Sequence, residues 1–469
     1  MTRRGPRATE SLLDYLALAA GENVADASFK SRLGSFLARP GTIVVVAFLI
    51  RFGIYYHLRS HGPYPISQTL PFGYETGRIA RALAAGEGYS SPLNVDTGPT
   101  AWMTPLFPLL LAAIFKIFGI YSWSSWLVIT TINCAFSALT AWPIHAIGTR
   151  AFGKATGVTA AWMWTFLRPA IFYPVFWVWD MSMAALVFAL ILLATTYMKD
   201  SERPGAWAGY GALWGFGALT NAAMVSTLPF LMGWLALRLR ARCKRWMQLV
   251  AASLMMFALV ISPWFVRNYT AFHKLILFRD NFGLELWLGN NVENPGIWSG
   301  WLHPNDNDAE RALFKKLGEL GYMDLKQRQA VEWIKAHPAE FVQDTAHRFI
   351  DNWTGLDEPI VDVLRGPWYE IGSVILAEIF PLLVFPGVLL ASRRRNPYTV
   401  PFAAVVLVFP LVYYITHTSL RYRHPMDPLL CVLASYALAT PVAWWVTRRA
   451  GAQAEASGAS GAGQVSSAS

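Results

Sequence analysis

Charged residues are scarce in this chain of 469 residues. Asp, Glu, Lys and Arg together make up 14% of it, whereas hydrophobic residues make up 54%. Soluble domains carry about 25% charged residues, so this chain holds more apolar side chain than one soluble core can bury. The charges nevertheless sum to a formal net charge of +10, which raises the question of a nucleic-acid partner.

The position of the basic residues argues against that partner. They fall in short clusters beside long apolar runs, at 238–245, 393–395 and 448–449. Clusters of this kind are typical of the cytoplasmic loops of membrane proteins. We therefore expect a multi-pass membrane protein whose basic clusters face the cytoplasm, and we expect no nucleic-acid partner.

Cysteine is almost absent, with Cys134, Cys243 and Cys431 as its three instances. No two of them form a Cys-x-x-Cys pair, so the sequence has neither a dithiol redox motif nor a zinc-finger spacing. It also has no Gly-rich phosphate loop and no nucleophile-elbow serine. These absences argue against a disulfide scaffold and against nucleotide chemistry at the cytoplasmic face.

Apolar runs of about 20 residues, the length that crosses a bilayer, recur along the chain. They predict an all-α bundle of ten transmembrane helices, at 40–58, 123–147, 155–174, 180–198, 206–222, 223–238, 246–266, 368–391, 398–417 and 427–446. Segment 103–118 is apolar but short, and prolines interrupt its start. We expect it to lie in the membrane interface, because only ten spans bring all the basic clusters to one side.

These spans divide the chain into five parts. They are a cytoplasmic N-terminal tail at 1–38, an N-terminal membrane module at 39–266 with an outer loop at 59–122, an outer cap at 267–367, C-terminal transmembrane helices at 368–446, and a disordered tail at 447–469. The tail is assigned as disordered because Gly, Ala and Ser dominate it.

Two of the outer segments show helical periodicity. In the cap, the spacing of apolar residues predicts helices at 309–320, 324–336 and 338–352. In the first outer loop, segment 73–89 is amphipathic and is expected to form a short helix at the membrane surface. The cap is therefore expected to be small and mainly helical.

Two carboxylates at the predicted outer face are candidates for chemistry, because charges near a bilayer are costly. Glu75 is either a helix-start carboxylate favoured by exposed N–H groups or a general base. Asp180 begins a span on the same side. It is either a second helix-start residue or a partner of Glu75, sharing base and orienting roles or a divalent metal ion. No motif of a resident cofactor is present.

The turn at 417–425, with the sequence His-Thr-Ser-Leu-Arg-Tyr-Arg-His-Pro, places positive charge on the side where it is rare. The guanidinium groups of Arg421 and Arg423, beside His424, suit a phosphate group at the membrane surface. The alternative is contact with acidic residues of the cap or with lipid head groups. Arg267, near the outer end of another span, is a further outer cation.

Five segments in this order resemble the GT-C superfamily of membrane glycosyltransferases. They are similar in particular to glycosyltransferase family 39, which includes protein O-mannosyltransferases and the lipid A aminoarabinose transferase. The segments are Glu75 to Tyr89 with its Gly-x-Gly-Tyr end, Gly98 to Trp102 followed by Pro105-Leu-Phe-Pro, Asp180, Pro263-Trp264 with Arg267-Asn268-Tyr269, and Arg421 to Pro425.

The resemblance implies transfer of a sugar from a polyisoprenyl-phosphate donor to a glycan, lipid or protein acceptor, at the outer face of a bacterial inner membrane. It implies a catalytic role for Glu75 and Asp180. The remaining site residues that it implies are Arg421, Arg423, His424 and Arg267 for the donor phosphate, and Tyr74, Trp102, Tyr422 and Asn268 for substrate contact. Family members commonly carry an Asp or an Asp-Glu pair where this chain has Glu75 alone.

Three other functions compete with this one. A lipid-linked glycan polymerase or ligase shares the long outer loop and the outer basic residues. A secondary transporter predicts an inverted repeat and ionisable residues at the middle of the membrane, and the sequence shows no clear repeat. A non-catalytic membrane scaffold is the third.

Overall fold

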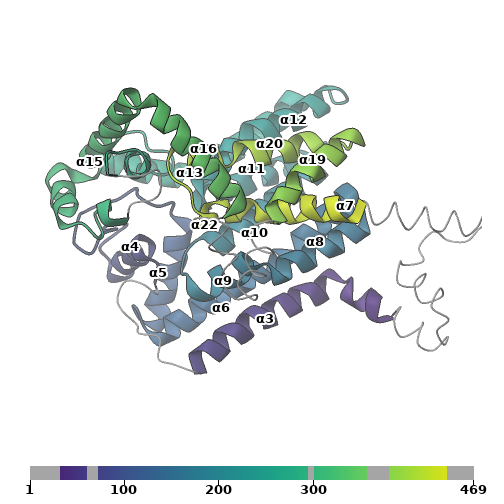
Figure 1. Ribbon diagram of the computed structural model, residues 1–469, viewed down its shortest axis with the longest axis horizontal. Coiled ribbons are helices and arrows are strands. Elements are labelled where there is room, and N and C mark those ends of the chain that lie inside the picture. The colour runs from purple at the N-terminus through teal and green to yellow at the C-terminus, as the bar shows by residue number, and fades with distance from the viewer. Residues whose placement is uncertain (1–31, 61–71, 294–299, 356–379, 441–469) are drawn as a thin grey trace, which may run out of the picture.

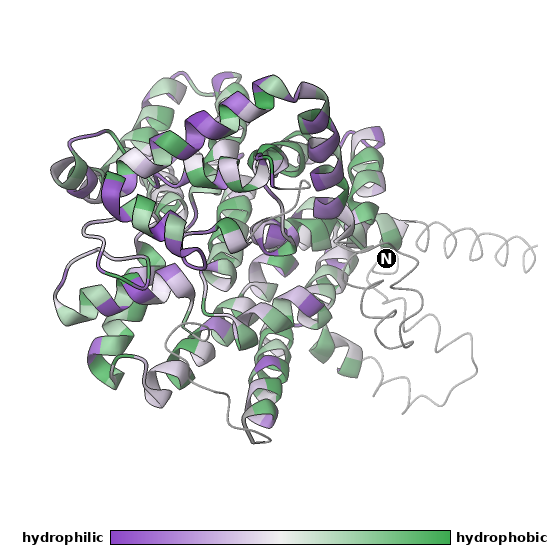
Figure 2. Ribbon diagram, turned by 60° about the vertical axis from the view of Figure 1, so that its left-hand side comes forward, coloured by the Kyte–Doolittle hydropathy of each residue, from purple (hydrophilic) through white to green (hydrophobic). Residues whose placement is uncertain are grey.

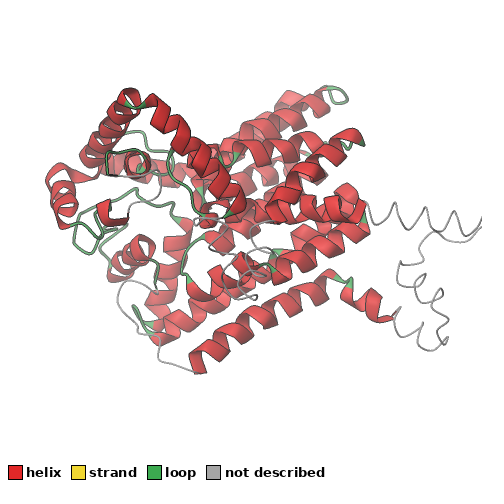
Figure 3. Cartoon of the chain, viewed as in Figure 1, coloured by secondary structure: helices red, strands yellow, loops and turns green. Residues whose placement is uncertain are grey.

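The computed structural model of the protein describes residues 32–60, 72–293, 300–355 and 380–440. Within these ranges the chain forms helices joined by turns, and the one extended pairing is an isolated bridge between Ser90 and Pro99 (Figure 3). Figure 1 shows the long helices running alongside one another, with α4 (Tyr74–Ala85) and α15 (Asp308–Ala336) gathered at one end of the bundle. The expected all-α class is confirmed.

The helices of the N-terminal module fill the first half of the chain. They are α3 (Pro40–Ser60), α4 (Tyr74–Ala85), α5 (Leu106–Phe118), α6 (Trp123–Leu139), α7 (Ala141–Phe152), α8 (Lys154–Phe166), α9 (Arg168–Phe176), α10 (Met181–Met198), α11 (Pro204–Thr220), η1 (Ala222–Thr227), α12 (Leu228–Arg240) and α13 (Trp246–Phe272).

The cap and the C-terminal part follow. The cap helices are α14 (Phe282–Gly289), η2 (Gly300–Leu302), α15 (Asp308–Ala336) and α16 (Pro338–Thr354). The C-terminal helices are η4 (Phe380–Leu383), α19 (Val384–Arg393), α20 (Thr399–Val408), α21 (Leu411–Ile415), α22 (Leu420–Arg423), η5 (His424–Met426) and a helix described over residues 427–440.

Five helical stretches of the described residues are long and apolar enough to cross a membrane. They are Pro40–Leu58, Trp123–Phe152, Met181–Met198, Ala222–Arg240 and Trp246–Phe272. Shorter apolar helices cover Leu106–Phe118, Phe380–Arg393 and Thr399–Ile415. The count of ten spans and the interfacial position of 103–118 therefore stay predictions. Most of the predicted N-terminal tail, the C-terminal tail and residues 368–379 of one predicted span lie outside the described residues.

The helices α3 and α13 keep most of their apolar side chains on the surface. Only 22% of the apolar window of each is buried inside the protein. Val45 and Leu49 on α3, and Met255 and Leu259 on α13, are all exposed. Because an apolar face of this extent is covered by lipid rather than by water in membrane proteins, these two helices form part of the membrane-facing surface. Figure 2 shows hydrophobic residues along the bundle helices.

The segment predicted as one span at 155–174 consists of two helices rather than one continuous helix, and its crossing of the membrane stays a prediction. The first, α8, ends at Phe166, and the second, α9, begins at Arg168. Pro169 lies at the junction and Pro174 lies inside α9. A proline lacks the backbone N–H of a helix and its ring crowds the carbonyl four residues before it, which explains the break.

The buried side chain of Arg51 on α3 supplies the donors that these prolines lack. In an α-helix the N–H of each residue binds the carbonyl four residues earlier, so Pro169 and Pro174 leave the carbonyls of Thr165 and Ala170 without that donor. The guanidinium of Arg51 donates to the carbonyl oxygen of Thr165 at 3.3 Å and to that of Ala170 at 2.9 Å. The same guanidinium also donates to the hydroxyl of Ser137 at 2.9 Å, so this charge inside the bundle has several hydrogen-bond acceptors.

The cap helix α15 is kinked at Gly318, which has φ 70° and ψ 169°. The two predicted helices at 309–320 and 324–336 are the two arms of this one element. The helix begins as expected after Asn307, whose side chain accepts a hydrogen bond from the backbone N–H of Glu310 at 3.0 Å. The kink places Glu319 against the first outer loop.

Candidate functional site

The start of α4 is fixed by its contact with the segment that leads into α10. Gly73 caps the helix with a φ of 82°, and a Cβ at this position would lie 2.0 Å from the carbonyl oxygen of Val178. The indole N–H of Trp179 donates to the carbonyl oxygen of Gly73 at 3.2 Å. Glu75 lies in the first turn of α4, so these contacts determine where its carboxylate projects.

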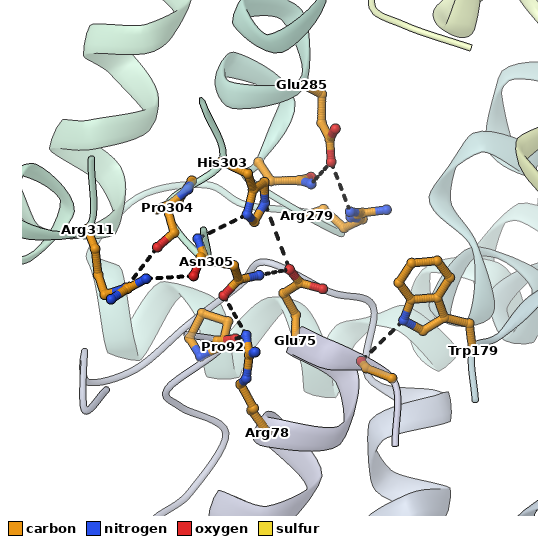
Figure 4. A network of polar contacts seen from close by, with 12 residues as sticks. Glu75, Arg78, Pro92, Trp179, Arg279, Glu285, His303, Pro304, Asn305 and Arg311 are labelled. Atoms are coloured by element: carbon orange, nitrogen blue, oxygen red, sulfur yellow. Dashed lines mark hydrogen bonds and ion pairs between the residues drawn. The ribbon is translucent and has the colours of Figure 1, made fainter. Parts of the chain in front are cut away.

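The carboxylate of Glu75 faces a loop of the cap (Figure 4). Its Oε1 accepts a hydrogen bond from Nδ2 of Asn305 and lies 3.8 Å from Nε2 of His303. Arg78, one turn after Glu75 on α4, donates from Nη1 to Oδ1 of the same asparagine. The cap loop at 303–305 therefore closes over the start of α4.

His303 is almost enclosed by the protein. Its ring packs edge-on against Trp102, with 5.6 Å between ring centroids. Burial lowers the pKa of His303, although the charges of Glu75 and Glu285 oppose that effect. The imidazole beside Glu75 is therefore neutral at neutral pH.

A second group of charged residues lies beside the first, on the cap. The Oε2 of Glu285 lies 2.7 Å from Nε2 of His417, and its Oε1 accepts a hydrogen bond from Nδ2 of Asn281 at 2.6 Å. Arg279 approaches the same carboxylate at 3.8 Å. Burial by itself raises the pKa of Glu285, but the hydrogen bond and charge of His417, together with Arg279, lower it to about 2. Glu285 is therefore a fixed anion.

Arg421 is the cation that the outer turn brings to this region. Its guanidinium carbon lies 4.2 Å from the ring centroid of Trp179, 4.9 Å from that of Tyr422 and 5.8 Å from that of Trp177. Its Nη2 donates to the hydroxyl of Tyr422 at 2.9 Å. Among the described residues, no carboxylate lies within 4.0 Å of this guanidinium. Aromatic faces thus hold the cation and leave its charge available to an anion.

Asp180 lies next to Trp179, at the start of α10. Its Oδ2 accepts a hydrogen bond from Nδ2 of Asn221 at 3.3 Å, so its partner is an amide rather than Glu75. Burial raises the pKa of Asp180, against the charges of Arg279 and Arg421 and the bond from Asn221. The predicted option of a shared metal ion gains no support, because the described residues contain no group of three or more His, Cys, Asp or Glu that could hold one.

Arg423 and His424 do not reach this site. Both are fully buried, and they share the carboxylate of Asp427. Nε of Arg423 donates to Oδ1 of Asp427 at 3.0 Å, and Nδ1 of His424 lies 3.0 Å from Oδ2. We expected both residues to face a phosphate at the outer surface, but the structure turns them into the bundle, where they join the outer turn to the last described helix.

Arg267 and Asn268 hold the first outer loop and the end of α13 in place. Arg267 donates to the carbonyl oxygens of Thr100, at 2.6 Å, and Tyr89. Asn268 is fully buried and donates to the carbonyl oxygen of Ile276 at 3.1 Å. Both residues thus bond to the backbone, and their phosphate and substrate contacts stay predictions.

The remaining expected residues lie around Glu75 and Arg421. Tyr74 precedes Glu75, and its ring centroid lies 6.1 Å from that of Trp179. Trp102 is almost fully buried behind His303. Tyr422 bonds to Arg421, as described. The structure thus gathers Glu75, Tyr74, Asp180, Arg421 and Tyr422 around one tryptophan, Trp179, and its neighbours, and leaves the other expected residues in supporting positions.

One carboxyl joins the first outer loop to the cap. Glu319 accepts hydrogen bonds from the hydroxyl of Thr100 at 2.5 Å and from the backbone N–H of Ala101 at 2.6 Å. Burial and the neighbouring charge of Asp280 raise the pKa of Glu319 well above its ordinary value. Arg279 donates to the carbonyl oxygen of Trp102 at 2.9 Å, so the same junction also positions Arg279.

Sequence reasoning missed Arg78, Arg279, Glu285, His303 and Asn305. Arg279 and Glu285 lie at the opening of the cap, which the predicted site did not include. The signal that was available is the positive charge of Arg279 on the side of the membrane where positive charge is rare. Arg78, His303 and Asn305 carry no such signal, because their contacts join positions that are far apart in the chain.

The class that this fold defines is the GT-C fold of membrane proteins, and solved structures share it. The oligosaccharyltransferase AglB of Archaeoglobus fulgidus, in complex with an inhibitory peptide and a dolichol-phosphate, matches with a TM-score of 0.54 and 15% identity over 88% of this chain and 52% of that chain. Its apo form matches with a TM-score of 0.54 and 14% identity, over the same shares of the two chains. This chain spans about half the length of the archaeal protein.

A third solved structure is more distant. It is ArnT of Cupriavidus metallidurans bound to undecaprenyl phosphate, which matches with a TM-score of 0.35 and 14% identity over 85% of this chain and 77% of that chain. No family model and no characterised protein sequence matches the chain. The comparisons therefore establish the fold and not the reaction.

Proposed function

We propose that this protein transfers a sugar from a polyisoprenyl-phosphate donor to an acceptor hydroxyl at the outer face of a bacterial inner membrane, as a relative of glycosyltransferase family 39. The observation that carries the proposal is the arrangement of Glu75 and Arg421 about Trp179. The ring of Trp179 lies against the Arg421 cation, and its N–H holds the start of the helix that carries the carboxylate.

Glu75 is the general base in the proposed reaction. It takes the proton of the acceptor hydroxyl while the acceptor oxygen forms a bond to the anomeric carbon of the sugar. The bond from that carbon to the donor phosphate oxygen breaks, and the polyisoprenyl phosphate leaves with the electron pair. Asp180, bonded to Asn221, orients the reacting sugar.

Arg421 stabilises the negative charge of the leaving phosphate. A guanidinium group offers several N–H donors in a plane that suits phosphate oxygens, and a fixed cation placed where charge develops lowers the barrier. Because a polyisoprenyl chain stays in the bilayer, its phosphate has to be met at the membrane surface. Arg421 follows the apolar stretch Thr399–Ile415 by six residues, which supports such a position.

The shared fold also supports a lipid-phosphate donor. The archaeal oligosaccharyltransferase with this fold was captured with a dolichol-phosphate and a peptide. We propose a donor of the same chemical class here, with a glycan, lipid or protein as the acceptor. The five segments that resemble family 39 favour a simple sugar over an oligosaccharide.

The experiment that tests this function is a transfer assay with purified protein in nanodiscs. A panel of undecaprenyl-phosphate and dolichyl-phosphate sugars, each labelled in the sugar, is incubated with the protein and a membrane extract as acceptor. We expect the wild type to consume one donor, and Glu75→Gln to slow transfer by about 10²–10⁴-fold, the usual contribution of a general base.

The matched control is Glu87→Gln. Glu87 lies on the same outer loop and forms an exposed salt bridge with Arg81 at 2.8 Å, away from the contacts of Glu75. We expect its transfer rate to equal that of the wild type. Undiminished transfer by a folded Glu75→Gln protein contradicts the proposed base.

A further inference from the structure

We infer that His303 and Asn305 are positioning residues that direct their side-chain N–H groups to one oxygen of Glu75, Oε1, and thereby leave Oε2 as the oxygen that takes the acceptor proton. The inference rests on the proposed function of Glu75 as the base. It goes beyond that function because it assigns the two roles to the two carboxylate oxygens and assigns their control to the cap.

The orientation of the Asn305 amide is fixed by Arg78. A guanidinium carries donors only, so the amide atom that faces it has to be the acceptor Oδ1. Nη1 of Arg78 bonds to that Oδ1 and also donates to the carbonyl oxygen of Pro92 at 3.2 Å. The opposite end of the amide, Nδ2, is therefore the end that meets Oε1 of Glu75.

The tautomer of His303 is fixed by the backbone of the same loop. The N–H of Asn305 donates to Nδ1 of His303 at 3.2 Å, so Nδ1 is the acceptor nitrogen. In a neutral ring the proton then lies on Nε2, the nitrogen that faces Oε1 of Glu75 at 3.8 Å. This distance is too long for a hydrogen bond, so His303 acts through the attraction between its N–H dipole and the carboxylate charge.

The loop that presents both residues is held from its other side as well. Arg311 on α15 donates to the carbonyl oxygen of Asn305 at 2.6 Å and to that of Pro304 at 2.9 Å (Figure 4). Arg78 holds the loop from α4, and Arg311 holds it from the cap helix. A loop fixed on both sides delivers its donors without reorganisation, which is the requirement for a preorganised site.

The two oxygens of Glu75 therefore differ. Within the described residues, the hydrogen bond to the carboxylate goes to Oε1, and no side chain or backbone group donates to Oε2. Oε1 has a lone pair engaged by its donor, whereas both lone pairs of Oε2 stay available for the acceptor proton. Loss of the donors on Oε1 lets the carboxylate turn, so that Oε2 is no longer held toward the acceptor hydroxyl.

The test separates the turnover number, kcat, from the KM of the acceptor in the transfer assay. Because the two residues orient the base and do not contact the substrate in this proposal, we expect Asn305→Ala to lower kcat about tenfold, as expected when a charged group loses one hydrogen bond, and to leave KM unchanged. We expect a smaller fall of kcat in His303→Ala and partial rescue in His303→Gln, which keeps an N–H donor.

Two further variants guard against a purely structural effect. Asn307→Ala removes the cap of α15, two residues from Asn305 and without contact to Glu75, and we expect it to leave kcat unchanged. Asn305→Asp keeps an oxygen for Arg78 but places a carboxylate where Glu75 receives an N–H donor. We expect it to lower kcat further than Asn305→Ala does.

The outcomes separate this inference from the function on which it rests. An unchanged kcat in Asn305→Ala and Asn305→Asp, with transfer lost in Glu75→Gln, overturns the positioning role alone. Undiminished transfer in Glu75→Gln overturns the base and with it the assignment of Oε2. An equal fall of kcat in Asn305→Ala and Asn307→Ala also overturns the inference, because it assigns the effect to the fold of the cap.

Discussion

The guanidinium of Arg421 lies over the ring of Trp179, 4.2 Å from its centroid, while the N–H of the same indole bonds to the backbone of Gly73. The face of one ring thus holds the outer cation, and its edge holds the start of the helix that carries Glu75. Trp179 therefore sets the distance between the proposed base and the proposed phosphate-binding group. A second ring against Arg421, that of Tyr422, stacks on Tyr413 with 4.9 Å between centroids.

Substitution of Arg421 is predicted to weaken the binding of undecaprenyl phosphate. In Arg421→Ala we expect the dissociation constant to rise at least tenfold, about 1.4 kcal/mol. Arg421→Lys is expected to recover little of this, because an ammonium does not stack on the rings and offers no planar fork. The measurement is a titration of protein in nanodiscs with the lipid. Arg81→Ala, which removes an exposed outer cation, is the control, and equal losses in the two variants contradict a specific role for Arg421.

Gly73 is predicted to be irreplaceable by alanine. Alanine rarely adopts the φ of 82° that Gly73 has, and its Cβ would lie 2.0 Å from the carbonyl oxygen of Val178. The substitution therefore forces the start of α4 to move. We expect Gly73→Ala to abolish sugar transfer and to lower the melting temperature. Gly86→Ala is the matched control, because Gly86 has a φ of 85° but open space around an added Cβ. It carries only the backbone strain, about 1–2 kcal/mol, and is expected to keep its transfer activity.

Local patterns predicted the elements and some of the site, but not the contacts between them. Helical spacing predicted α4, α15 and α16 but not α14, and the expected rarity of positive charge at the outer face indicated Arg421. The bond from Asn305 to Glu75 joins residues 230 positions apart, and no local pattern carries that information. The inward direction of the Arg423 side chain, in contrast, could have been predicted from a local pattern. Arg421 and Arg423 lie two residues apart on the helical turn α22, so they project to different faces, and this spacing was present in the sequence.

Glu285 is predicted to stabilise the cap in a pH-dependent way. Its pKa of about 2 in the folded protein lies below the ordinary value of 4.5. A lowered folded-state pKa stabilises the protein fully above pH 4.5, and this stabilisation is lost as the pH falls toward 2. This lowering of the pKa contributes at most about 3 kcal/mol to the free energy of unfolding at neutral pH.

The corresponding measurement compares the melting temperatures of the wild type and Glu285→Gln at pH 7, 4 and 2.5. We expect a deficit in the variant at pH 7 that shrinks below pH 4.5. Asp324→Asn, which removes an exposed salt bridge to Lys274 of 3.2 Å, serves as the control and is expected to change little. A melting-temperature deficit that stays constant across this pH range contradicts the prediction that the ionised form of Glu285 provides the stabilisation.

Arg51 is predicted to stabilise the protein only because it donates to the two carbonyls that Pro169 and Pro174 leave without a backbone donor. Arg51→Leu leaves the carbonyl of Thr165 without a donor inside the bundle and leaves that of Ala170 with the hydroxyl of Ser137 alone. A buried group that loses its donor costs about 1–3 kcal/mol. We expect the free energy of unfolding in detergent to fall by about that amount. Replacing Pro169 and Pro174 with alanine restores the missing backbone donors, so Arg51→Leu is expected to cost far less in that background. Equal losses in the two backgrounds mean that Arg51 stabilises the bundle by packing rather than by replacing the donors of the prolines.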